Sequence, residues 1–273
     1  MTKINCSIVL YRTNADDVVS ILSSLRAAPQ VNRIIIIDNS PDDALKALIG
    51  EGVEYIHRPD NPGYGIAHNL ALRRSLADES VKYHLVVNAD ILFQGNVLEV
   101  LLSYMDAHPE CGLTMPRVLN PDGTPQHLCK LLPAPIDLFG RRFLGSYYES
   151  SARNKRFAFT DYPYDEPLDA PYLSGCFMLI RTQTLRQTGL FDENFFMYLE
   201  DTDLSRRIAS VSATRCVPSG TVIHKHGRAS YRSMKMLMHH ISSTVRYFNK
   251  WGWLRDPERK RLNGLALKQY KRN

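Results

Sequence analysis

Three carboxylic acids follow a run of apolar residues near position 200. The segment 195–207 reads FFMYLEDTDLSRR and contains Glu200, Asp201 and Asp203. Placing a carboxylate against a buried apolar wall costs free energy unless the acid is paired, caps a helix or takes part in chemistry. These acids are therefore the first candidates for acid–base chemistry in the chain.

The same segment also has the pattern of a helix that begins at the acids. Leu204, Ile208 and Val211 follow the i, i+4, i+7 spacing of a buried helix face. Asp203 and Arg207 are spaced as an i, i+4 ion pair, and the helix dipole stabilises acids in a first turn. The residues alone leave a structural helix start and a catalytic site as equal alternatives.

Polar side chains end the first two strands that the sequence predicts. Residues 4–11 and 31–37 are apolar and β-branched enough for buried strands, and they end at Tyr11 and Asp38. Ligands of parallel α/β sheets bind beyond the carboxyl ends of the strands. Tyr11 and Asp38 are thus either ligand-binding residues or simple turn formers.

Two later strands also end in residues that could hold a metal ion. The apolar strand 83–87 is followed by Asn88 and Asp90, and the strand 215–222 by His224. An acid at the end of a buried strand, beside a second strand-end acid, suits a hard cation that holds a diphosphate. A plain turn, and a structural histidine, are the alternatives.

A loop rich in Pro and Gly leads from residue 58 into a helix predicted over 66–76. Its glycines would let the backbone approach a phosphate, and the start of the helix offers free N–H groups. The pattern is neither a Walker loop nor a GxGxxG motif, so by itself it is a weak sign of nucleotide binding.

Strands and helices alternate along most of the chain, which predicts an α/β fold with a mostly parallel sheet. Helices are predicted at 14–27, with Asn14 as N-cap, and at 43–48, 66–76 and 96–105; further strands at 53–57 and 172–181. Residues 121–167 are the least regular region and are expected to be a functional or partly disordered loop. The region carries a basic cluster that either meets an anionic acceptor or is solvated: Arg141, Arg142, Arg153, Lys155 and Arg156.

Composition limits the class of protein. A chain of 273 residues with 44% apolar residues can form one large domain or two small ones, and no apolar run is long enough for a membrane span. The start of the sequence lacks the pattern of a signal peptide, so a cytoplasmic protein is expected. The five cysteines are scattered and lack a CxxC pair, which favours reduced, buried thiols.

Positive charge is concentrated at the end of the chain. Residues 225–273 contain 13 Lys and Arg against 2 Asp and Glu, whereas residues 1–224 contain 21 against 26. No recognition motif accompanies this charge, so nucleic-acid binding is not expected. An apolar stripe (Met234, Leu237, Met238, Ile241, Val245, Phe248) with Trp251 and Trp253 fits an interfacial helix at a membrane surface. Equally, the stripe could pack on the preceding residues or on a second subunit of a homodimer.

Several motifs in order resemble the family-2 inverting glycosyltransferases of the GT-A fold, among them the bacterial rhamnosyltransferases of O-antigen and related surface polysaccharides. They are IIIIDNS (34–40), NPGYGIAHN (61–69), VVNAD (86–90), YLSGCFMLIR (172–181), GLFDENFFMYLEDTDLSRR (189–207) and the segment around His224. The resemblance implies a Rossmann-like nucleotide-sugar-binding domain over 1–227, with a nucleotide half (1–115) and an acceptor and catalytic half (116–227). Residues 228–273 would be a basic helical extension.

The resemblance also implies roles for the strand-end residues. Tyr11 and Asp38 would bracket the nucleotide base, with the Asp38 carboxylate accepting a hydrogen bond from the pyrimidine N3–H. Asp90 matches the last acid of the DxD motif and would bind Mg²⁺ or Mn²⁺, with His224 as a second ligand. Three residues would line the nucleotide or diphosphate side: Asn61, Gly63 and His68.

The chain departs from the family pattern at two of these positions. Asn88 stands where the first acid of DxD is expected, so it would supply a neutral ligand or a ribose hydrogen bond. The site then carries one negative charge fewer, and metal binding would depend on the oxygens of the nucleotide diphosphate. His68 stands where many relatives have arginine.

For the acids of the opening segment, the resemblance implies that Asp201 is the general base. Glu200 is the alternative base, or a residue that positions the acceptor or donor sugar. The implied reaction transfers L-rhamnose from dTDP-rhamnose to a hydroxyl of a lipid-linked or oligosaccharide acceptor, in the cytoplasm or at the inner face of the membrane. Two alternatives are a UDP-sugar donor (hexose, N-acetylhexosamine or galactofuranose) and a nucleotide-sugar-binding protein with weak or no catalysis.

Overall fold

The computed structural model describes residues 3–93, 95–143, 145–225 and 234–270. The domain boundary expected at 227 lies outside the described residues, as do the side chains of Arg141 and Arg142 from the basic cluster.

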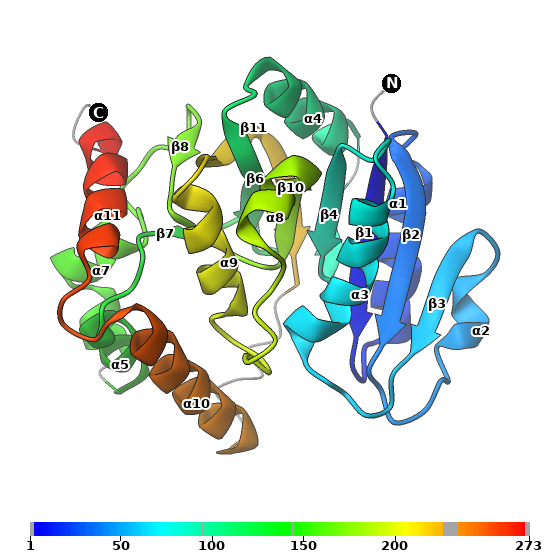
Figure 1. Cartoon of the computed structure of the whole chain (residues 1–273), viewed down its shortest axis with the longest axis horizontal. Coiled ribbons are helices and arrows are strands. Elements are labelled where there is room, and N and C mark those ends of the chain that lie inside the picture. The colour runs from blue at the N-terminus through cyan, green and yellow to red at the C-terminus, as the bar shows by residue number, and fades with distance from the viewer. Residues whose placement is uncertain (1–2, 94, 144, 226–233, 271–273) are drawn as a thin grey trace.

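Within the described residues, nine strands form one mixed, largely parallel sheet at the centre of the molecule (Figure 1). In order of pairing they are β3 (Val53–His57), β2 (Val31–Asp38), β1 (Ile4–Leu10), β4 (Tyr83–Val87), β10 (Phe177–Arg181), β6 (Cys111–Leu119), β11 (Ala213–His224) and β5 (Ile91–Leu92), with β8 (Leu168–Asp169) also on β11. The first four strands are parallel, whereas β10 is antiparallel to both of its neighbours. The expected α/β fold with a mostly parallel sheet is confirmed.

The helices and a small second sheet surround these strands. The helices are α1 (Ala15–Arg26), α2 (Lys46–Ile49), α3 (Tyr64–Ala77), α4 (Val97–Ala107), α5 (Pro135–Phe143), α6 (Gly145–Glu149), α7 (Ala152–Phe157), α8 (Thr182–Thr188), α9 (Glu200–Ala209), α10 (Met234–Trp251) and α11 (Pro257–Tyr270). The second sheet pairs β7 (Cys129–Lys130) with β9 (Tyr172–Leu173). In Figure 1, α1 lies behind the sheet and α3 in front of it, while α10 and α11 lie at the end opposite β3. None of the described helices is long and apolar enough to span a membrane.

The second strand shows why an uninterrupted apolar run must be covered on both faces. Ile34 and Ile36 pack in the main core with residues of α1, and Ile35 and Ile37 pack against Ala67 and its neighbours on α3. Side chains alternate between the faces of a strand, so four successive isoleucines need a helix on each side. The N-cap expected at the start of α1 is also confirmed, because the Asn14 Oδ1 accepts from the Asp16 N–H at 2.9 Å.

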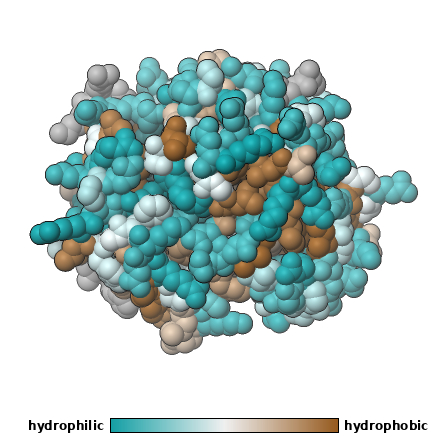
Figure 2. Space-filling model, in the orientation of Figure 1, coloured by the Kyte–Doolittle hydropathy of each residue, from teal (hydrophilic) through white to brown (hydrophobic). Residues whose placement is uncertain are grey.

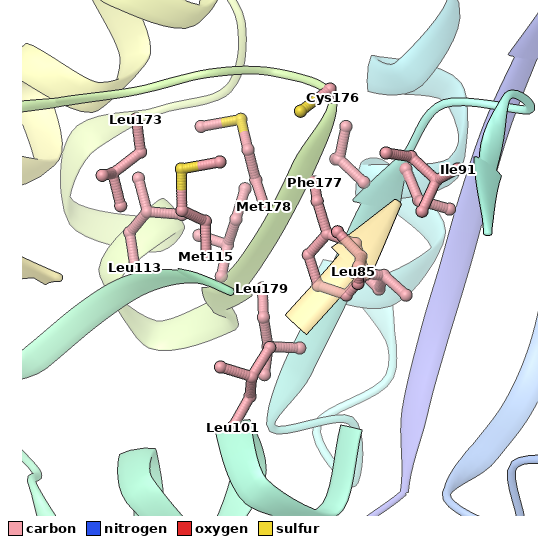
Figure 3. Packing of buried hydrophobic residues seen from close by; sticks show 14 of the residues in the cluster. Leu85, Ile91, Leu101, Leu113, Met115, Leu173, Cys176, Phe177, Met178 and Leu179 are labelled. Carbon is pink, nitrogen blue, oxygen red and sulfur yellow. The ribbon is translucent and has the colours of Figure 1, made fainter. Parts of the chain in front are cut away.

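The main core lies between the sheet and its helices. Figure 3 shows apolar side chains from neighbouring strands gathered with a residue of α4: Leu85, Leu113, Met115, Phe177, Leu179 and Leu101. All five cysteines are buried and unpaired, as expected for reduced thiols.

Two expectations about irregular segments were wrong. Residues 121–167 contain β7 and the helices α5, α6 and α7, which are nine, five and six residues long. The strand expected over 172–181 is interrupted after Leu173, where the chain turns so that Gly175 approaches Asp201. In the basic cluster, Arg153 pairs with the buried Asp137 at 2.6 Å.

The C-terminal helices pack on α9, the helix that starts with the three acids. Tyr247 and Phe248 of α10 are fully buried against Phe195 and Leu199, which precede α9. Met238, from the same apolar stripe, is 59% exposed. The stripe is thus divided: one part packs on the chain itself, and the other faces solvent.

A buried polar network joins α3 to the first and fourth strands. The Ser7 Oγ lies 2.7 Å from His68 Nδ1 and 2.8 Å from His84 Nε2, and the Ser75 Oγ lies 2.7 Å from His84 Nδ1. Burial lowers the pKa of His84 to about 3 and also lowers the pKa of His68, with the neighbouring His84 as a second cause. Both imidazoles are therefore neutral in the folded protein.

These histidines predict a loss of stability in mild acid. The unfolded chain binds protons at a histidine pKa near 6.5, whereas the folded chain does not until much lower pH. Their contribution is complete above that pH and falls by about 1.4 kcal/mol per pH unit for each histidine below it. Denaturant unfolding at several pH values should show this slope, and His84→Asn should reduce it by about half. An unchanged slope in the variant would contradict the assignment.

Candidate active site

A cleft of about 430 Å³ lies where α9 begins, next to the ends of β4 and β11. Several segments far apart in the sequence contribute to it: Tyr64 from α3, Asn88 after β4, Lys130 from β7, Tyr172 and Gly175 around β9, residues 197–202, His224 at the end of β11 and His240 from α10. The structure thus brings together four residues singled out in the sequence: Asn88, Glu200, Asp201 and His224.

The Asp201 carboxylate is held in a defined orientation at the wall of this cleft. Its Oδ2 accepts from the Gly175 N–H at 2.9 Å and from the Tyr172 hydroxyl at 3.2 Å. Its Oδ1 accepts from the Thr202 N–H at 2.7 Å. A Cβ at Gly175 would lie 3.2 Å from the Asp201 Cβ, so the glycine allows this close approach.

The neighbouring Glu200 is in a different environment. Its side chain is buried, and its Oε2 has no hydrogen-bond partner among the described residues. Burial, followed by the charge of Asp201, holds the pKa of Glu200 well above its usual range. Two adjacent carboxyl groups with different environments can take different chemical roles.

The turn that leads into α9 is strained. Tyr198 and Leu199 both have positive φ, at 69° and 66°, although neither is a glycine. Such a backbone costs of order 1–3 kcal/mol per residue and persists only where the surroundings enforce it. Here contacts with α10 hold the backbone in this conformation. The Ser243 hydroxyl of α10 donates to the Met197 carbonyl at 2.8 Å. Leu199 packs against Tyr247 and Phe248 of the same helix.

A second pair of site residues, Asp90 and His224, meets at the ends of their strands. The His224 Nε2 lies 3.3 Å from the Asp90 Oδ1. The other ring nitrogen of His224, Nδ1, lies 3.0 Å from the Gln126 Oε1. The Nε2 of Gln126 already donates to the Asn120 Oδ1 and the His224 carbonyl, both at 2.8 Å.

This arrangement selects one tautomer of His224. Because the Gln126 amide nitrogen is committed to two acceptors, its oxygen faces the ring and must accept from Nδ1–H. In the neutral imidazole this leaves Nε2, which lies on the side of Asp90, as the nitrogen that can bind a cation. A metal-binding histidine is commonly oriented in this way by a partner on its second nitrogen.

The pair fits one side of a divalent cation site. Ligands at right angles around Mg²⁺ at about 2.1 Å lie about 3 Å apart, close to the separation of the Asp90 oxygen and the His224 nitrogen. Within the described part of the chain, no three His, Cys, Asp or Glu side chains form a metal site on their own. A cation held here would therefore need further oxygens from a bound ligand.

Asn88 lies in the cleft between these two groups of residues. Its Oδ1 is 3.1 Å from the Tyr64 hydroxyl, which also donates to the Gly175 carbonyl at 2.8 Å. The Asn88 N–H donates to the Cys176 carbonyl at 2.9 Å. Asn88 is thus linked to the turn that also holds Asp201.

Tyr11 and Asp38 are adjacent, but they do not line the cleft. Leu10 pairs with Asp38 in the sheet, which places both strand ends on the same edge as the end of β4. Tyr11 is exposed, whereas Asp38 is buried and accepts from the Tyr55 hydroxyl at 2.8 Å and the Ser40 N–H at 2.9 Å. Contact of either residue with a nucleotide base stays a prediction.

Asn61 and Gly63, which are expected on the diphosphate side, have different surroundings in the structure. Asn61 has a positive φ of 43° in the turn before α3. Gly63 lies against the Phe196 backbone, because a Cβ there would come within 2.3 Å of the Phe196 carbonyl oxygen. That oxygen also accepts from the Tyr64 N–H at 3.0 Å, so a protein group takes one donor at the start of α3.

His68 differs most from its expected position. The helix α3 begins at Tyr64, and its inward face carries Gly65, His68 and Leu72. His68 is therefore fully buried, bonded to Ser7 and packed against the Tyr64 ring at 4.4 Å. In the structure it supports the helix from inside, and its contact with a diphosphate stays a prediction.

Comparison with known proteins decides the family. The sequence profile described as glycosyl transferase family 2 matches residues 7–189. The chain belongs to this family. The matched residues include every strand-end position discussed above except His224, and they end just before the segment that carries Glu200 and Asp201.

Two curated relatives of this family-2 glycosyltransferase are rhamnosyltransferases. One is the N-acetylglucosaminyl-diphospho-decaprenol L-rhamnosyltransferase of Mycobacterium tuberculosis, 28% identical over 87% of this chain and 82% of the relative. The other is the rhamnosyltransferase WbbL of Escherichia coli K12, 26% identical over 88% of this chain and 90% of the relative.

Two solved structures show that the fold is GT-A-like. The structure of GalNAc-T7 with UDP, GalNAc and Mn²⁺ has a TM-score of 0.61 at 14% identity, and it covers 92% of this chain and 48% of that chain. The mannosyltransferase PcManGT of Pyrobaculum calidifontis with GDP-Man and Mn²⁺ has a TM-score of 0.57 at 14% identity, covering 99% and 75%.

The sequence did not point to several residues that position the site. Gln126 lies in the region expected to be irregular, and its contact with His224 spans 98 positions. Tyr172 carried no signal of its own, whereas Gly175 did, since a glycine in a strand pattern marks a close approach.

The role of Gln126 can be tested by metal binding. Gln126→Leu removes the acceptor that fixes the His224 tautomer, so Mn²⁺ affinity in the presence of a nucleoside diphosphate should fall about 10- to 100-fold. Titration calorimetry measures the affinity without turnover. Gln269→Leu is the control, because the Gln269 side chain also makes hydrogen bonds, at 2.8 and 2.9 Å, but does not line the cleft. Equal losses in both variants would reduce Gln126 to a structural role.

Proposed function

We propose that the chain transfers a sugar from a nucleoside diphosphate to an acceptor hydroxyl with inversion, using Asp201 as the general base. The observation that supports this most directly is the meeting of Asp201, Asn88 and His224 in one cleft of a family-2 glycosyltransferase. The attacking hydroxyl must lose its proton as the bond to the anomeric carbon forms. An oriented carboxylate at the cleft wall suits that task.

The environments of the two acids favour Asp201 over Glu200 as the base. Glu200 is buried, and burial together with the charge of Asp201 raises its pKa well above the usual range, which favours its protonated form. A protonated acid cannot accept a further proton from the acceptor, but it can donate a hydrogen bond. Asp201 receives donors on both of its oxygens and borders the cleft.

The leaving diphosphate would lie on the side of Asp90 and His224. A Mg²⁺ or Mn²⁺ ion bound there would offset negative charge on the departing group. Asp90 and the Nε2 of His224 would hold that ion, while Gln126 keeps the imidazole in the required tautomer. Asn88 would contribute a neutral amide to the ion or the ribose.

For the donor we favour dTDP-L-rhamnose, and for the acceptor a lipid-linked or oligosaccharide hydroxyl. Support comes from the two curated relatives, both rhamnosyltransferases, one of which is named for a diphospho-decaprenol acceptor. The lining of the cleft also contains Tyr172, Phe157 and Leu138, whose rings and apolar groups offer a surface on which a sugar ring can stack. A UDP-sugar donor is the alternative, and so is a nucleotide-sugar-binding protein with weak or no catalysis.

Paired amide variants test the assignment of the base. Asp201→Asn should lower kcat about 10²- to 10⁴-fold, because an amide cannot accept the proton. Glu200→Gln should retain most of the activity, since an amide resembles the protonated acid that the raised pKa of Glu200 favours. Donor binding measured by calorimetry should be unchanged in both. The reverse pattern would make Glu200 the base, and a wild type without turnover would favour the binding protein.

A panel of nucleotide sugars tests the donor. A ligand that binds only the folded state stabilises it by an amount set by its concentration and Kd, about 2.7 kcal/mol at one hundred times Kd. dTDP-rhamnose with Mn²⁺ should therefore raise Tm more than dTDP-glucose, UDP-glucose or UDP-N-acetylglucosamine at equal concentration. Stabilisation by UDP-sugars alone would replace the proposed donor.

A further inference from the structure

A second and larger hollow, of about 1190 Å³, lies beside the active-site cleft. The segment before α5 and the helix α7 form one wall, and the turn from α10 to α11 and the helix α11 form the other. Phe157 lines both the hollow and the cleft, so the two share a wall. We call this hollow the basic groove.

Cationic side chains dominate the rim of the basic groove. They are Arg153, Arg156, Arg255, Arg259 and Lys260, from two regions about one hundred positions apart. Arg153 pairs with Asp137, but no ion pair or side-chain hydrogen bond within the described residues involves Arg156, Arg255 or Lys260. Both walls therefore present unneutralised positive charge.

The two acids that line the groove do not cancel this charge. Asp137 is buried and accepts from the Tyr148 hydroxyl and the Arg153 Nε, each at 2.6 Å. Asp256 is buried and bound by both terminal nitrogens of Arg206 at 2.6 Å, behind the groove. Each acid is already neutralised by its own arginine, so the remaining cations set the local potential.

An exposed apolar tip stands at the edge of the groove. Leu254, in the turn between α10 and α11, is 89% exposed, more than any other large apolar side chain among the described residues. Gly252 makes the tight turn, since it has φ 102° and a Cβ there would lie 2.5 Å from the Arg255 carbonyl oxygen. The half-exposed Trp253 lies beside the tip. Figure 2 shows small apolar groups at the lower left, over α10 and this turn, within a mostly hydrophilic surface.

The groove is held open by protein contacts. The Asn263 side chain of α11 accepts from the Leu132 N–H at 2.8 Å and donates to the Leu132 carbonyl at 2.9 Å, which fixes α11 to the opposite wall. Gly264, on the groove side of α11, has open space where a Cβ would project. A ligand would thus meet a formed site.

We propose that this surface docks the enzyme on an anionic membrane. Lipid phosphates would enter the basic groove, and Leu254 and Trp253 would enter the interfacial layer next to it. In a bilayer the lipid phosphates lie just outside the hydrocarbon. Cationic side chains can therefore contact the phosphates while an apolar side chain that protrudes beside them enters the interfacial layer. A nucleic acid or an acidic peptide would leave Leu254 in water. The shared Phe157 then places the active-site cleft next to the membrane surface.

This docking surface differs from the exposed stripe of α10. Met234 and Met238 are also exposed, but the described cationic lining of the groove lies along α7, the turn and α11. Docking through the groove does not depend on the identity of the donor or on catalysis, so it can succeed or fail independently of the proposed function.

Vesicle sedimentation with the full chain tests the proposal. The protein should bind phosphatidylcholine vesicles that contain phosphatidylglycerol at low salt, and should bind pure phosphatidylcholine vesicles much more weakly. Equal binding to both would overturn the electrostatic part of the proposal. Absence of binding to either would overturn docking as a whole.

Matched charge variants locate the surface. Arg156→Gln with Lys260→Gln should weaken binding about 25-fold, since each cation near an anionic surface contributes roughly fivefold. Arg33→Gln with Lys46→Gln makes the same change in net charge on exposed residues near the other end of the molecule and should have little effect. Equal losses in both double variants would show a net-charge effect and contradict the assignment to the groove.

Three further variants separate the parts of the surface. Leu254→Ser should weaken binding about tenfold through lost apolar insertion, whereas Met238→Ser should not. Gly264→Glu should weaken it by placing negative charge in the groove, with Gly264→Ala as a folded control. A loss only in Met238→Ser would assign docking to α10. Binding of inorganic diphosphate to a protein that ignores vesicles would make the groove a site for small anions.

Discussion

The buried ion pair between Arg206 and Asp256 is the constraint on which the geometry of the active-site helix depends. Both side chains are only 2% exposed, and both guanidinium nitrogens reach the carboxylate at 2.6 Å. Removing either charge would leave the other buried and unpaired, which typically costs 3–5 kcal/mol in stability. The pair therefore fixes α9 to the turn before α11, and the Trp251 ring, 4.1 Å from the Arg206 guanidinium, adds α10 to the same joint. Asp203 strengthens it by accepting from the Trp251 Nε1 at 2.8 Å while pairing with Arg207.

This joint explains how a strained turn persists beside Glu200 and Asp201. Tyr198 and Leu199 adopt left-handed backbone that an isolated chain would relax. With α9 anchored behind them and α10 packed over them, relaxation would require breaking buried contacts on two helices. The strain thus sets where Glu200 and Asp201 begin their helix, with both residues at the cleft and Glu200 the more deeply buried of the two. In this way the C-terminal helices help to shape the cleft that Glu200 and Asp201 line.

Local patterns allowed much of this architecture to be predicted from the sequence. The four successive isoleucines of β2, the Asn14 cap and the Asp203–Arg207 pair follow from spacing within one element, and spacing is visible in a single sequence.

Helices α5, α6 and α7 are too short to show a period, so their region was expected to be irregular. The face of α3 on which His68 lies depends on the residue at which the helix begins, and sequence patterns define helix starts poorly. The partners of Asp201 and His224 come from distant segments, and neither contact could be read from spacing.

The distribution of charge in the cleft follows from what it is proposed to bind. A nucleoside diphosphate brings several negative charges, and unpaired carboxylates nearby would repel it. Two features of the chain reduce that repulsion: Asn88 carries an amide where the family pattern has an acid, and burial raises the pKa of Glu200 and so favours its uncharged form. Asp90 and His224 alone offer a cation too few ligands. A diphosphate that binds without a cation is repelled by the negative charge of Asp90. The cation and the diphosphate each supply charge that the other needs, so metal and nucleotide should bind cooperatively, and this coupling is the electrostatic consequence of having one acid fewer.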